Sequence, residues 1–331
     1  MAMTNQQTRT LGKTGPGVFP MALGCMGMSG MYGPSDEAES TATIHAALDA
    51  GINLIDTGDF YGMGHNEMLI GRALRLRREE VVLSVKFGAQ RGPDGVWLGY
   101  DARPSAVKTW LAYSLKRLGT DYIDIYRPSR LDPQVPIEET VGAIAEMVKA
   151  GYVRHIGLSE VGPETIRRAA SVHPIVDLQI EYSILTRGAE AKIFPVLKEL
   201  GIATTGYGLL SRGLISRSKP AEKGDFRAFL PRFRGANLDR NQKLIDELGR
   251  MAADKGATPV QLAIAWALAK QSSLVPVVGA RTRAQLAESL GALEVKLTAG
   301  EIAALEAAVP AEAVAGTRYG ADQMRVLDSE Q

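Results

Sequence analysis

The residues best suited to chemistry lie in two short segments at the ends of predicted strands. Residues 56–62 contain Asp56 and Tyr61, and residues 85–88 contain Lys86. A tyrosine titrates near ~10, but a neighbouring lysine cation stabilises its phenolate and lowers its pKa. We therefore expect Tyr61 to protonate a carbonyl oxygen while a hydride reaches the carbonyl carbon, with Asp56 holding Lys86 charged. The alternative is a structural Asp56–Lys86 ion pair with Tyr61 at its rim.

Eight short apolar runs alternate with amphipathic helical stretches and must position these side chains. The runs cover residues 20–25, 52–56, 81–86, 122–126, 155–158, 178–182, 203–207 and 274–278. Eight such β–α repeats predict a parallel sheet that closes into a barrel. The predicted fold class is therefore α/β, a single-domain (β/α)8 TIM barrel over residues 1–331. A doubly wound open sheet is the alternative.

Segments outside the repeats complete the predicted barrel. Residues 8–19 carry turn glycines and predict an N-terminal hairpin that plugs the bottom, and residues 240–255 and 299–309 predict two extra helices. We expect residues 310–331 to form a C-terminal tail over the mouth. The C-terminal strand ends of such a barrel form the active-site mouth, and the polar residues fall at those ends.

Composition limits the kinds of partner. The chain has 331 residues, a formal net charge of +1 and one cysteine, Cys25. Near-zero charge favours neither nucleic acid nor an anionic membrane, a single cysteine excludes an internal disulfide, and no apolar run approaches the ~20 residues of a membrane span. The first ten residues are polar, so we expect no signal peptide and a cytoplasmic protein. The strand ends lack the paired acidic residues that would indicate a metal site. The sequence does not determine the oligomeric state.

Hydride chemistry needs a donor, and the sequence contains a phosphate-binding pattern without the usual dinucleotide fingerprint. No G-x-G-x-x-G follows a strand, which argues against a Rossmann domain. Arg281 and Arg283 instead open a helix after the run 274–278, and a helix start with two arginines suits a phosphate. The glycines of residues 207–213 let backbone approach a ligand. A solvated helix start is the alternative for the arginines.

With these motifs in place, the chain resembles the aldo-keto reductases from residue 9 to about residue 309. Residues 55–62 resemble the family's Asp-Thr-Ala-x-x-Tyr-Gly motif with glycine for alanine, and residues 157–160 resemble its Gly-Leu-Ser-Asn/Glu strand end. Residues 178–183 and 279–289 also match in order and spacing. The resemblance implies an enzyme that reduces a small-molecule carbonyl with NADPH, with NADH as the alternative. It also implies that Tyr61 is the acid, supported by Lys86 and Asp56.

The resemblance further implies three groups of cofactor-binding residues. Those expected at the nicotinamide are Ser159, Gln179 and Tyr207. Those expected along the pyrophosphate are Leu209, Ser211 and Gly213. Those expected around the adenine and its ribose are Gly279, Arg281, Gln285, Glu288 and Ser289.

One position departs from the family's active site. The family places a histidine after the fourth strand, where this chain has Ser129. Serine can donate or accept a hydrogen bond but cannot be a cation, and it is shorter than histidine. None of the four histidines replaces it by position, since His65, the nearest to Tyr61, is expected on a loop. Because the shorter side chain leaves the pocket more room, we expect Ser129 to give a working enzyme that accepts a narrower range of substrates.

The expected substrate pocket is aromatic. Its predicted lining residues are Met28, Tyr32, Phe60 and Trp97. This composition favours an aromatic or ring-shaped carbonyl compound, and relatives that lack the histidine and reduce pyridoxal make pyridoxal a candidate. One alternative is an NADPH-binding regulatory protein with weak turnover, resembling the potassium-channel β-subunits. Another is a lyase-type or sugar-converting barrel without nicotinamide.

Overall fold

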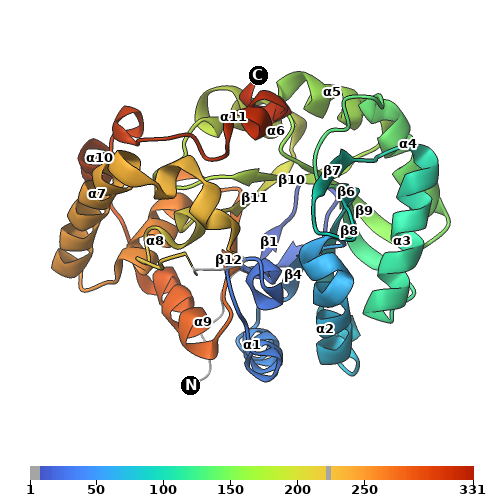
Figure 1. Ribbon diagram of the computed structural model, residues 1–331, viewed down its shortest axis with the longest axis horizontal. Coiled ribbons are helices and arrows are strands. Elements are labelled where there is room, and N and C mark those ends of the chain that lie inside the picture. The colour runs from blue at the N-terminus through green and yellow to red at the C-terminus, as the bar shows by residue number, and fades with distance from the viewer. Residues whose placement is uncertain (1–7, 221–224) are drawn as a thin grey trace.

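Eight parallel strands close into one barrel in the computed structural model, which describes residues 8–220 and 225–331 (Figure 1). Around the barrel the order is β10-β11-β12-β3-β4-β5-β8-β9. The strand bounds are β3 (Ala22–Gly24), β4 (Leu54–Gly58), β5 (Val82–Phe87), β8 (Ile123–Pro128), β9 (Val153–Ser159), β10 (Ile175–Glu181), β11 (Ala203–Tyr207) and β12 (Leu274–Gly279). All eight predicted runs are strands, so the predicted barrel is confirmed.

Helices surround the barrel because each strand must bury its outer face as well as its inner one. Their bounds are α1 (Glu37–Asp49), α2 (His65–Leu74), α3 (Pro104–Leu118), α4 (Ile137–Lys149), α5 (Pro163–Val172), α6 (Ala189–Leu200), α8 (Pro259–Lys270) and α9 (Arg283–Leu290). The prediction that His65 lies on a loop is wrong, because His65 is the first residue of α2. Gly64 precedes it with φ +92° and no side-chain cap, so the usual signal of a helix start is missing.

The N-terminal hairpin and the two extra helices are also present. Strands β1 (Arg9–Thr10) and β2 (Gly17–Val18) pair antiparallel, and α7 (Gly235–Asp254) and α10 (Ala299–Ala308) lie outside the eight repeats. Leu11 and Val18 are fully buried in one cluster with barrel residues such as Leu54 and Ile125. The hairpin therefore closes the bottom of the barrel with apolar side chains.

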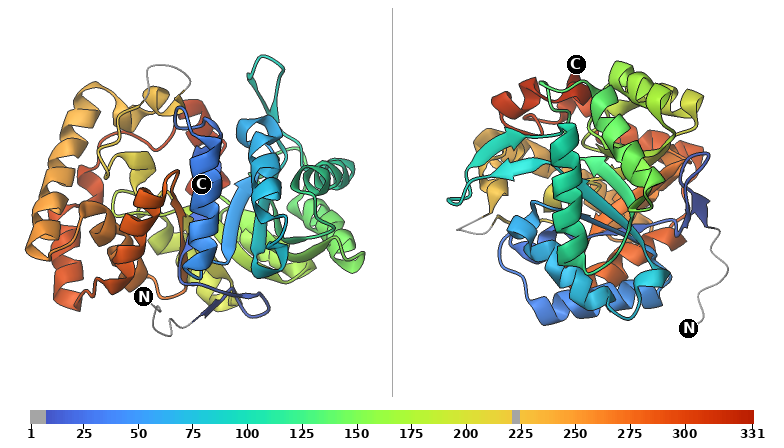
Figure 2. Two further views of the ribbon diagram at one scale, coloured as in Figure 1. Left: turned by 90° about the horizontal axis from the view of Figure 1, so that it is seen from below. Right: turned by 90° about the vertical axis from the view of Figure 1, so that its right-hand side faces the viewer.

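Two further segments reach the mouth. The loop after β5 contains an antiparallel hairpin, β6 (Ala89–Arg91) and β7 (Trp97–Tyr100), which projects from the body of the molecule (Figure 2). The tail carries the short helix α11 (Ala321–Arg325) and ends beside α5 and α6 (Figure 1). There the backbone amide of Gly162 donates to the Asp328 carboxylate at 2.7 Å.

Cys25 directly follows β3 and is fully buried. Its backbone amide donates to the carbonyl of Asp56 at 3.0 Å, and its own carbonyl accepts from the Asn66 side chain at 2.9 Å. In the part of the chain that the structure describes, no helix has the length and apolar character that a bilayer crossing requires.

Candidate active site

A closed ring of hydrogen bonds joins three of the expected residues at the mouth. Lys86 Nζ donates to Asp56 Oδ1 at 2.5 Å and to Gln179 Oε1 at 3.0 Å. Gln179 Nε2 completes the ring by donating to Asp56 Oδ2 at 2.8 Å. All three residues are buried, so Lys86 keeps its charge only because carboxylate and amide oxygens surround it. The structure thus brings together strands β4, β5 and β10.

Beneath this ring lies a second polar layer, which was not predicted from the sequence. Arg127 Nη2 donates to Ser84 Oγ at 3.0 Å, and Ser84 Oγ donates onward to Asp56 Oδ2 at 2.9 Å. Arg127 Nη1 also pairs with Asp177 at 2.8 Å, and both side chains are fully buried. Arg127 and Asp177 are oppositely charged residues in two otherwise apolar strands. The same pattern indicated Lys86 and Asp56, so it could also have indicated this pair.

Tyr61 lies directly above Lys86. It follows β4 in a tight turn, and Lys86 Nζ stands 5.2 Å from the centre of its ring. Burial raises the pKa of Tyr61 well above its usual value, the Asp56 charge raises it further, and the Arg130 cation opposes them. The expected lowering of the Tyr61 pKa is therefore wrong for this structure, because desolvation of the 6% exposed tyrosine outweighs nearby positive charge. Burial also lowers the pKa of Lys86.

Ser129 and Arg130 follow β8 on the side of the mouth next to Lys86. The Ser129 amide donates to the Phe87 carbonyl at 2.8 Å, and its buried hydroxyl has no hydrogen-bond partner among the residues described. Arg130 was not predicted as a site residue. Its guanidinium donates to the Ser129 carbonyl at 2.6 Å and to the Tyr319 hydroxyl at 3.0 Å, and it lies 3.5 Å from Ser159 Oγ.

The expected nicotinamide residues lie on adjacent strand ends. Ser159 ends β9, Gln179 lies in β10 and Tyr207 ends β11. The Tyr207 hydroxyl donates to Glu160 Oε1 at 2.9 Å and lies 3.1 Å from the Tyr319 hydroxyl. Ser159 is buried, and Tyr207 is partly buried. The tail residue Tyr319 therefore contacts the same part of the mouth.

The tail is held there by a buried ion pair that has no local sequence signal. Arg318 donates to both oxygens of Glu160, at 2.8 and 2.6 Å, and also pairs with Glu330 at 2.7 Å. Burial alone would raise the pKa of Glu160, but the Arg318 charge and hydrogen bonds hold that pKa well below its usual range. Sequence patterns did not reveal this pair because its partners lie 158 positions apart.

The expected pyrophosphate residues lie in a loop with unusual backbone geometry. Leu209 and Ser211 are buried, while Ser211, Arg212 and Gly213 have φ values of +46°, +58° and +92°. A Cβ at Gly213 would lie 2.9 Å from Arg227 Nη1, so a larger residue there is strained. The loop therefore holds a left-handed conformation that only glycine adopts without cost.

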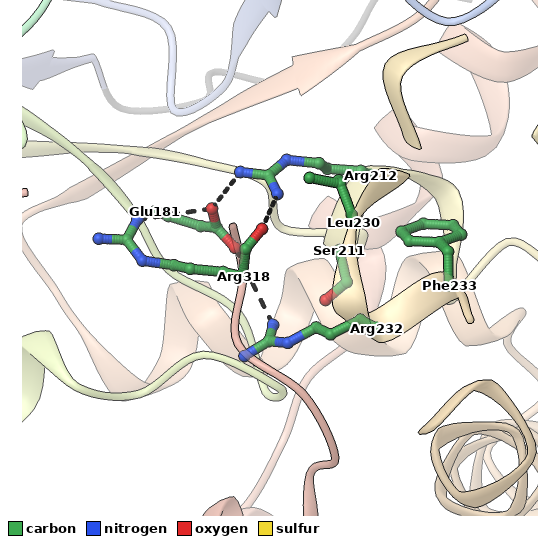
Figure 3. A pocket seen from close by; sticks show the side chains of 7 residues that line it. All are labelled: Glu181, Ser211, Arg212, Leu230, Arg232, Phe233 and Arg318. Carbon is green, nitrogen blue, oxygen red and sulfur yellow. Dashed lines mark hydrogen bonds and ion pairs between the residues drawn. The ribbon is translucent and has the colours of Figure 1, made fainter. Parts of the chain in front are cut away.

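Three arginines close over this loop (Figure 3). Arg212, Arg318 and Arg232 converge on Glu181, at 2.6, 3.5 and 4.0 Å. The cavity that they enclose beside Ser211 measures about 10 Å³, which is room for about one water molecule. The arginine cluster therefore fills the space above the loop.

The expected adenine residues lie at the end of β12, in the turn that follows it and along helix α9. Arg281 donates to the carbonyls of Tyr32 and Pro34 at 3.1 and 3.0 Å, and its amide donates to Gln285 Oε1 at 2.9 Å. Ser289 Oγ donates to the Gln285 carbonyl at 2.9 Å. Gly279 ends β12, and Glu288 is half-buried on α9. One strand end and one helix therefore bring this group together.

Aromatic rings extend from Tyr61 along one side of the mouth. Phe60 packs edge-on against Tyr61 and Trp97, with centroids 4.7 and 6.2 Å apart, and Trp97 packs against Tyr100 at 5.3 Å. Elsewhere Tyr32 stacks on Phe226 at 5.5 Å. Met28 is fully buried in the core. Phe60 and Trp97 are thus adjacent. Tyr32 lies near enough to Tyr61 and Tyr319 to interact with both electrostatically, whereas Met28 belongs to the core.

This geometry suits proton transfer to an oxygen at the mouth, without a metal ligand set. A buried acid, Tyr61, lies over a lysine that two oxygen-bearing side chains fix in place. Within residues 8–220 and 225–331, no group of three or more histidine, cysteine, aspartate or glutamate side chains is arranged to bind a metal ion.

Comparisons with known proteins agree with this arrangement. A sequence model of the Aldo/keto reductase family matches residues 20–310. Probable aldo-keto reductase 1 of Glycine max is 40% identical over 326 residues, spanning 96% of this chain and 93% of that protein.

Solved structures agree as well. Glycerol dehydrogenase AKR11B4 of Gluconobacter oxydans is 27% identical with a TM-score of 0.82, over 93% of this chain and 97% of its own. Aldo-keto reductase AKR11C1 of Bacillus halodurans, in its holo form, is 28% identical with a TM-score of 0.72 over the same shares. Sequence and structure together establish that this chain belongs to the aldo/keto reductase family.

Proposed function

We propose that this protein reduces an aldehyde or a ketone to an alcohol with NADPH, and that Tyr61 donates the proton. As an aldo/keto reductase it is an oxidoreductase of small-molecule carbonyl compounds. The observation that carries the finer proposal is the position of Lys86, bonded to Asp56 and Gln179 and 5.2 Å from the Tyr61 ring centre. A merely structural ion pair would not require a tyrosine above the lysine.

The protonation state of Tyr61 fits the reductive direction. Because burial raises its pKa, Tyr61 is protonated at neutral pH, which is the form that a proton donor needs. The ring of Asp56, Lys86 and Gln179 fixes a positive charge below it. As the proton leaves, that charge stabilises the phenolate that remains.

Several groups are suited to NADPH, which supplies the hydride when bound. The buried Ser129 hydroxyl lacks a partner among the described residues, as expected of a group that hydrogen-bonds a ligand. Ser159 and Tyr207 would hold the nicotinamide end. At the other end, Arg283 pairs with Glu39 at 2.9 Å on the exposed surface, and such a pair readily exchanges its carboxylate for a phosphate.

The arginine cluster at Glu181 sets a condition for cofactor binding. A cavity of about 10 Å³ beside Ser211 cannot accept a phosphate group. A pyrophosphate at Ser211 and Gly213 would therefore require the side chain of Arg212 or Arg318 to move.

For the substrate, we propose an aromatic or ring-shaped carbonyl compound such as pyridoxal. Phe60, Trp97 and Tyr100 form a continuous set of edge-on ring contacts that begins at Tyr61. Trp97 is 37% exposed, so its ring remains accessible to a ligand. Flat rings pack well against such faces and edges.

The test is NADPH oxidation by the purified protein with aromatic aldehydes, simple sugars and pyridoxal, beside a Tyr61→Phe variant. We expect oxidation that Tyr61→Phe abolishes, with the ring-shaped substrates preferred. Tight NADPH binding without turnover on any carbonyl would instead favour the regulatory, cofactor-binding alternative. Absence of NADPH binding would contradict both.

A further inference from the structure

Arg130 differs in its partners from three other arginines at the mouth. Arg127, Arg212 and Arg318 each pair with a buried carboxylate, respectively Asp177, Glu181 and Glu160. For Arg130, by contrast, no carboxylate among the described residues lies within 4.0 Å. Its hydrogen bonds go only to neutral oxygens. The Glu160 carboxylate acts on Arg130 only from beyond contact distance. A partly buried cation with no carboxylate in contact is stabilised further when negative charge forms beside it.

Arg130 lies at the end of the site where the nicotinamide is expected. Its guanidinium lies 3.5 Å from Ser159 Oγ and 3.0 Å from the Tyr319 hydroxyl, which in turn lies 3.1 Å from Tyr207. Its neighbour Ser129 hydrogen-bonds the backbone next to Lys86. Arg130 is also the cation that most opposes the raised pKa of Tyr61.

The reaction proposed above creates negative charge at this point. The carbonyl carbon would gain a hydride and its electron pair from NADPH, which would be oxidised to NADP+. Negative charge therefore develops on the carbonyl oxygen until the proton from Tyr61 Oη neutralises it. Tyr61 remains as a phenolate until solvent reprotonates it. Ser129 cannot supply positive charge to either oxygen, and Lys86 is already bonded to Asp56.

We propose that Arg130 supplies the positive charge that Ser129 cannot, stabilising the developing oxyanion and the Tyr61 phenolate. This inference rests on the proposed carbonyl reduction. It makes Arg130 a catalytic residue one position along the chain from the usual histidine. A purely structural role, in which Arg130 only anchors the tail through Tyr319, is the competing explanation.

Four variants separate the effect of the Arg130 charge from the effect of anchoring the tail through Tyr319. Arg130→Gln removes the charge, Arg130→Lys retains it, and Tyr319→Phe removes the tail contact while leaving Arg130 intact. Arg103→Gln removes an arginine that pairs with Asp101 outside the site and is 67% exposed in its side chain. Arg130→Met, which keeps the aliphatic stem, is the second neutral variant should Arg130→Gln fail to fold.

Two readouts are needed. We expect Arg130→Gln to lower kcat by about 10²-fold, as removal of one oxyanion donor does, while Arg130→Lys loses far less and Tyr319→Phe and Arg103→Gln stay near the parent. In the protein without cofactor, the Tyr61 pKa is followed by NMR of isotope-labelled tyrosine, with Tyr61→Phe assigning its signal. That pKa should rise further in both neutral variants.

The inference is overturned if the neutral variants leave kcat and the Tyr61 pKa unchanged, or if Tyr319→Phe reproduces their loss of activity. Failure of the proposed carbonyl reduction would give a different result. In that case the parent protein itself turns over no carbonyl, whatever the effect of Arg130 on the Tyr61 pKa.

Discussion

The ammonium of Lys86 lies 5.2 Å from the centre of the Tyr61 ring and donates sideways to Asp56 and Gln179. The ammonium thus faces the ring of the tyrosine, and its described hydrogen bonds go to Asp56 and Gln179. The positive charge of Lys86 depends on its ion pair with Asp56. Without Lys86, in turn, the buried Asp56 carboxylate would have no cation beside it.

Lys86→Met should therefore affect both rate and stability. We expect kcat to fall by about 10²- to 10⁴-fold, because the phenolate loses its cation. We expect the free energy of unfolding to fall by about 3–5 kcal/mol, because Asp56 remains buried without a partner. Lys108→Met, which breaks an exposed pair with Glu146, should change neither steady-state kinetics nor urea unfolding. Parent-like kcat in Lys86→Met would contradict the role of the lysine.

Asp59 predicts a pH dependence of stability. Burial raises its pKa to about 7, against hydrogen bonds that lower it, while an unfolded aspartate titrates near ~3.9. The folded protein thus holds a proton that the unfolded chain releases between these values. Its contribution to stability is greatest at acid pH, declines as pH rises towards 7, and is constant above.

Asp59→Asn should flatten this slope, measured by urea unfolding between about pH 5 and about pH 8. Asp322→Asn, on an exposed side chain, is the control and should retain the parental slope. A slope that persists unchanged in Asp59→Asn would show that another group carries it.

The tail anchor predicts a large effect from one substitution. Arg318→Met leaves Glu160 and Glu181 without their shared cation, so we expect a loss of about 3–5 kcal/mol in unfolding free energy. Limited proteolysis should cut the tail faster in this variant. Arg325→Gln, which breaks an exposed pair with Asp322, should cost less than about 1 kcal/mol. Equal effects of the two substitutions would argue against a buried anchor.

Gly213 tests the left-handed loop. Gly213→Ala introduces a Cβ 2.9 Å from Arg227 at a φ of +92°, so it should destabilise the fold by about 1–2 kcal/mol and weaken NADPH binding. Gly300→Ala is the matched control, because its Cβ would meet no atom within 4 Å in helix α10. It should stabilise the protein slightly in thermal unfolding. Unaltered NADPH affinity in Gly213→Ala would remove the loop from the proposed site.

The barrel was predictable because its signals are local. Apolar runs such as residues 203–207 become strands at nearly the predicted bounds, and polar residues at their ends, such as Lys86, meet at the mouth. Helix α2 was missed because Gly64 gives no capping signal. The β6–β7 hairpin, which carries Trp97, was not predicted, because its sequence lacks a regular apolar alternation.

The rest of the site depends on contacts that sequence spacing does not encode. Glu160 meets Arg318 from 158 positions away, and Arg130 meets Tyr319 from 189 positions away. The Tyr61 pKa was predicted in the wrong direction because its burial depends on how the mouth closes. Residue types indicate which groups can react, but desolvation decides their charge state.

The reactivity of Cys25 can report how often the barrel opens. It is the chain's single cysteine, its side chain is fully buried, and burial raises the pKa of its thiol well above the usual value. Since its backbone is tied to Asp56, the sulfur becomes reactive only when the barrel itself opens. The rate at which a thiol reagent labels the unaltered protein therefore reports barrel opening directly, and a bound ligand that holds the mouth closed would slow that labelling.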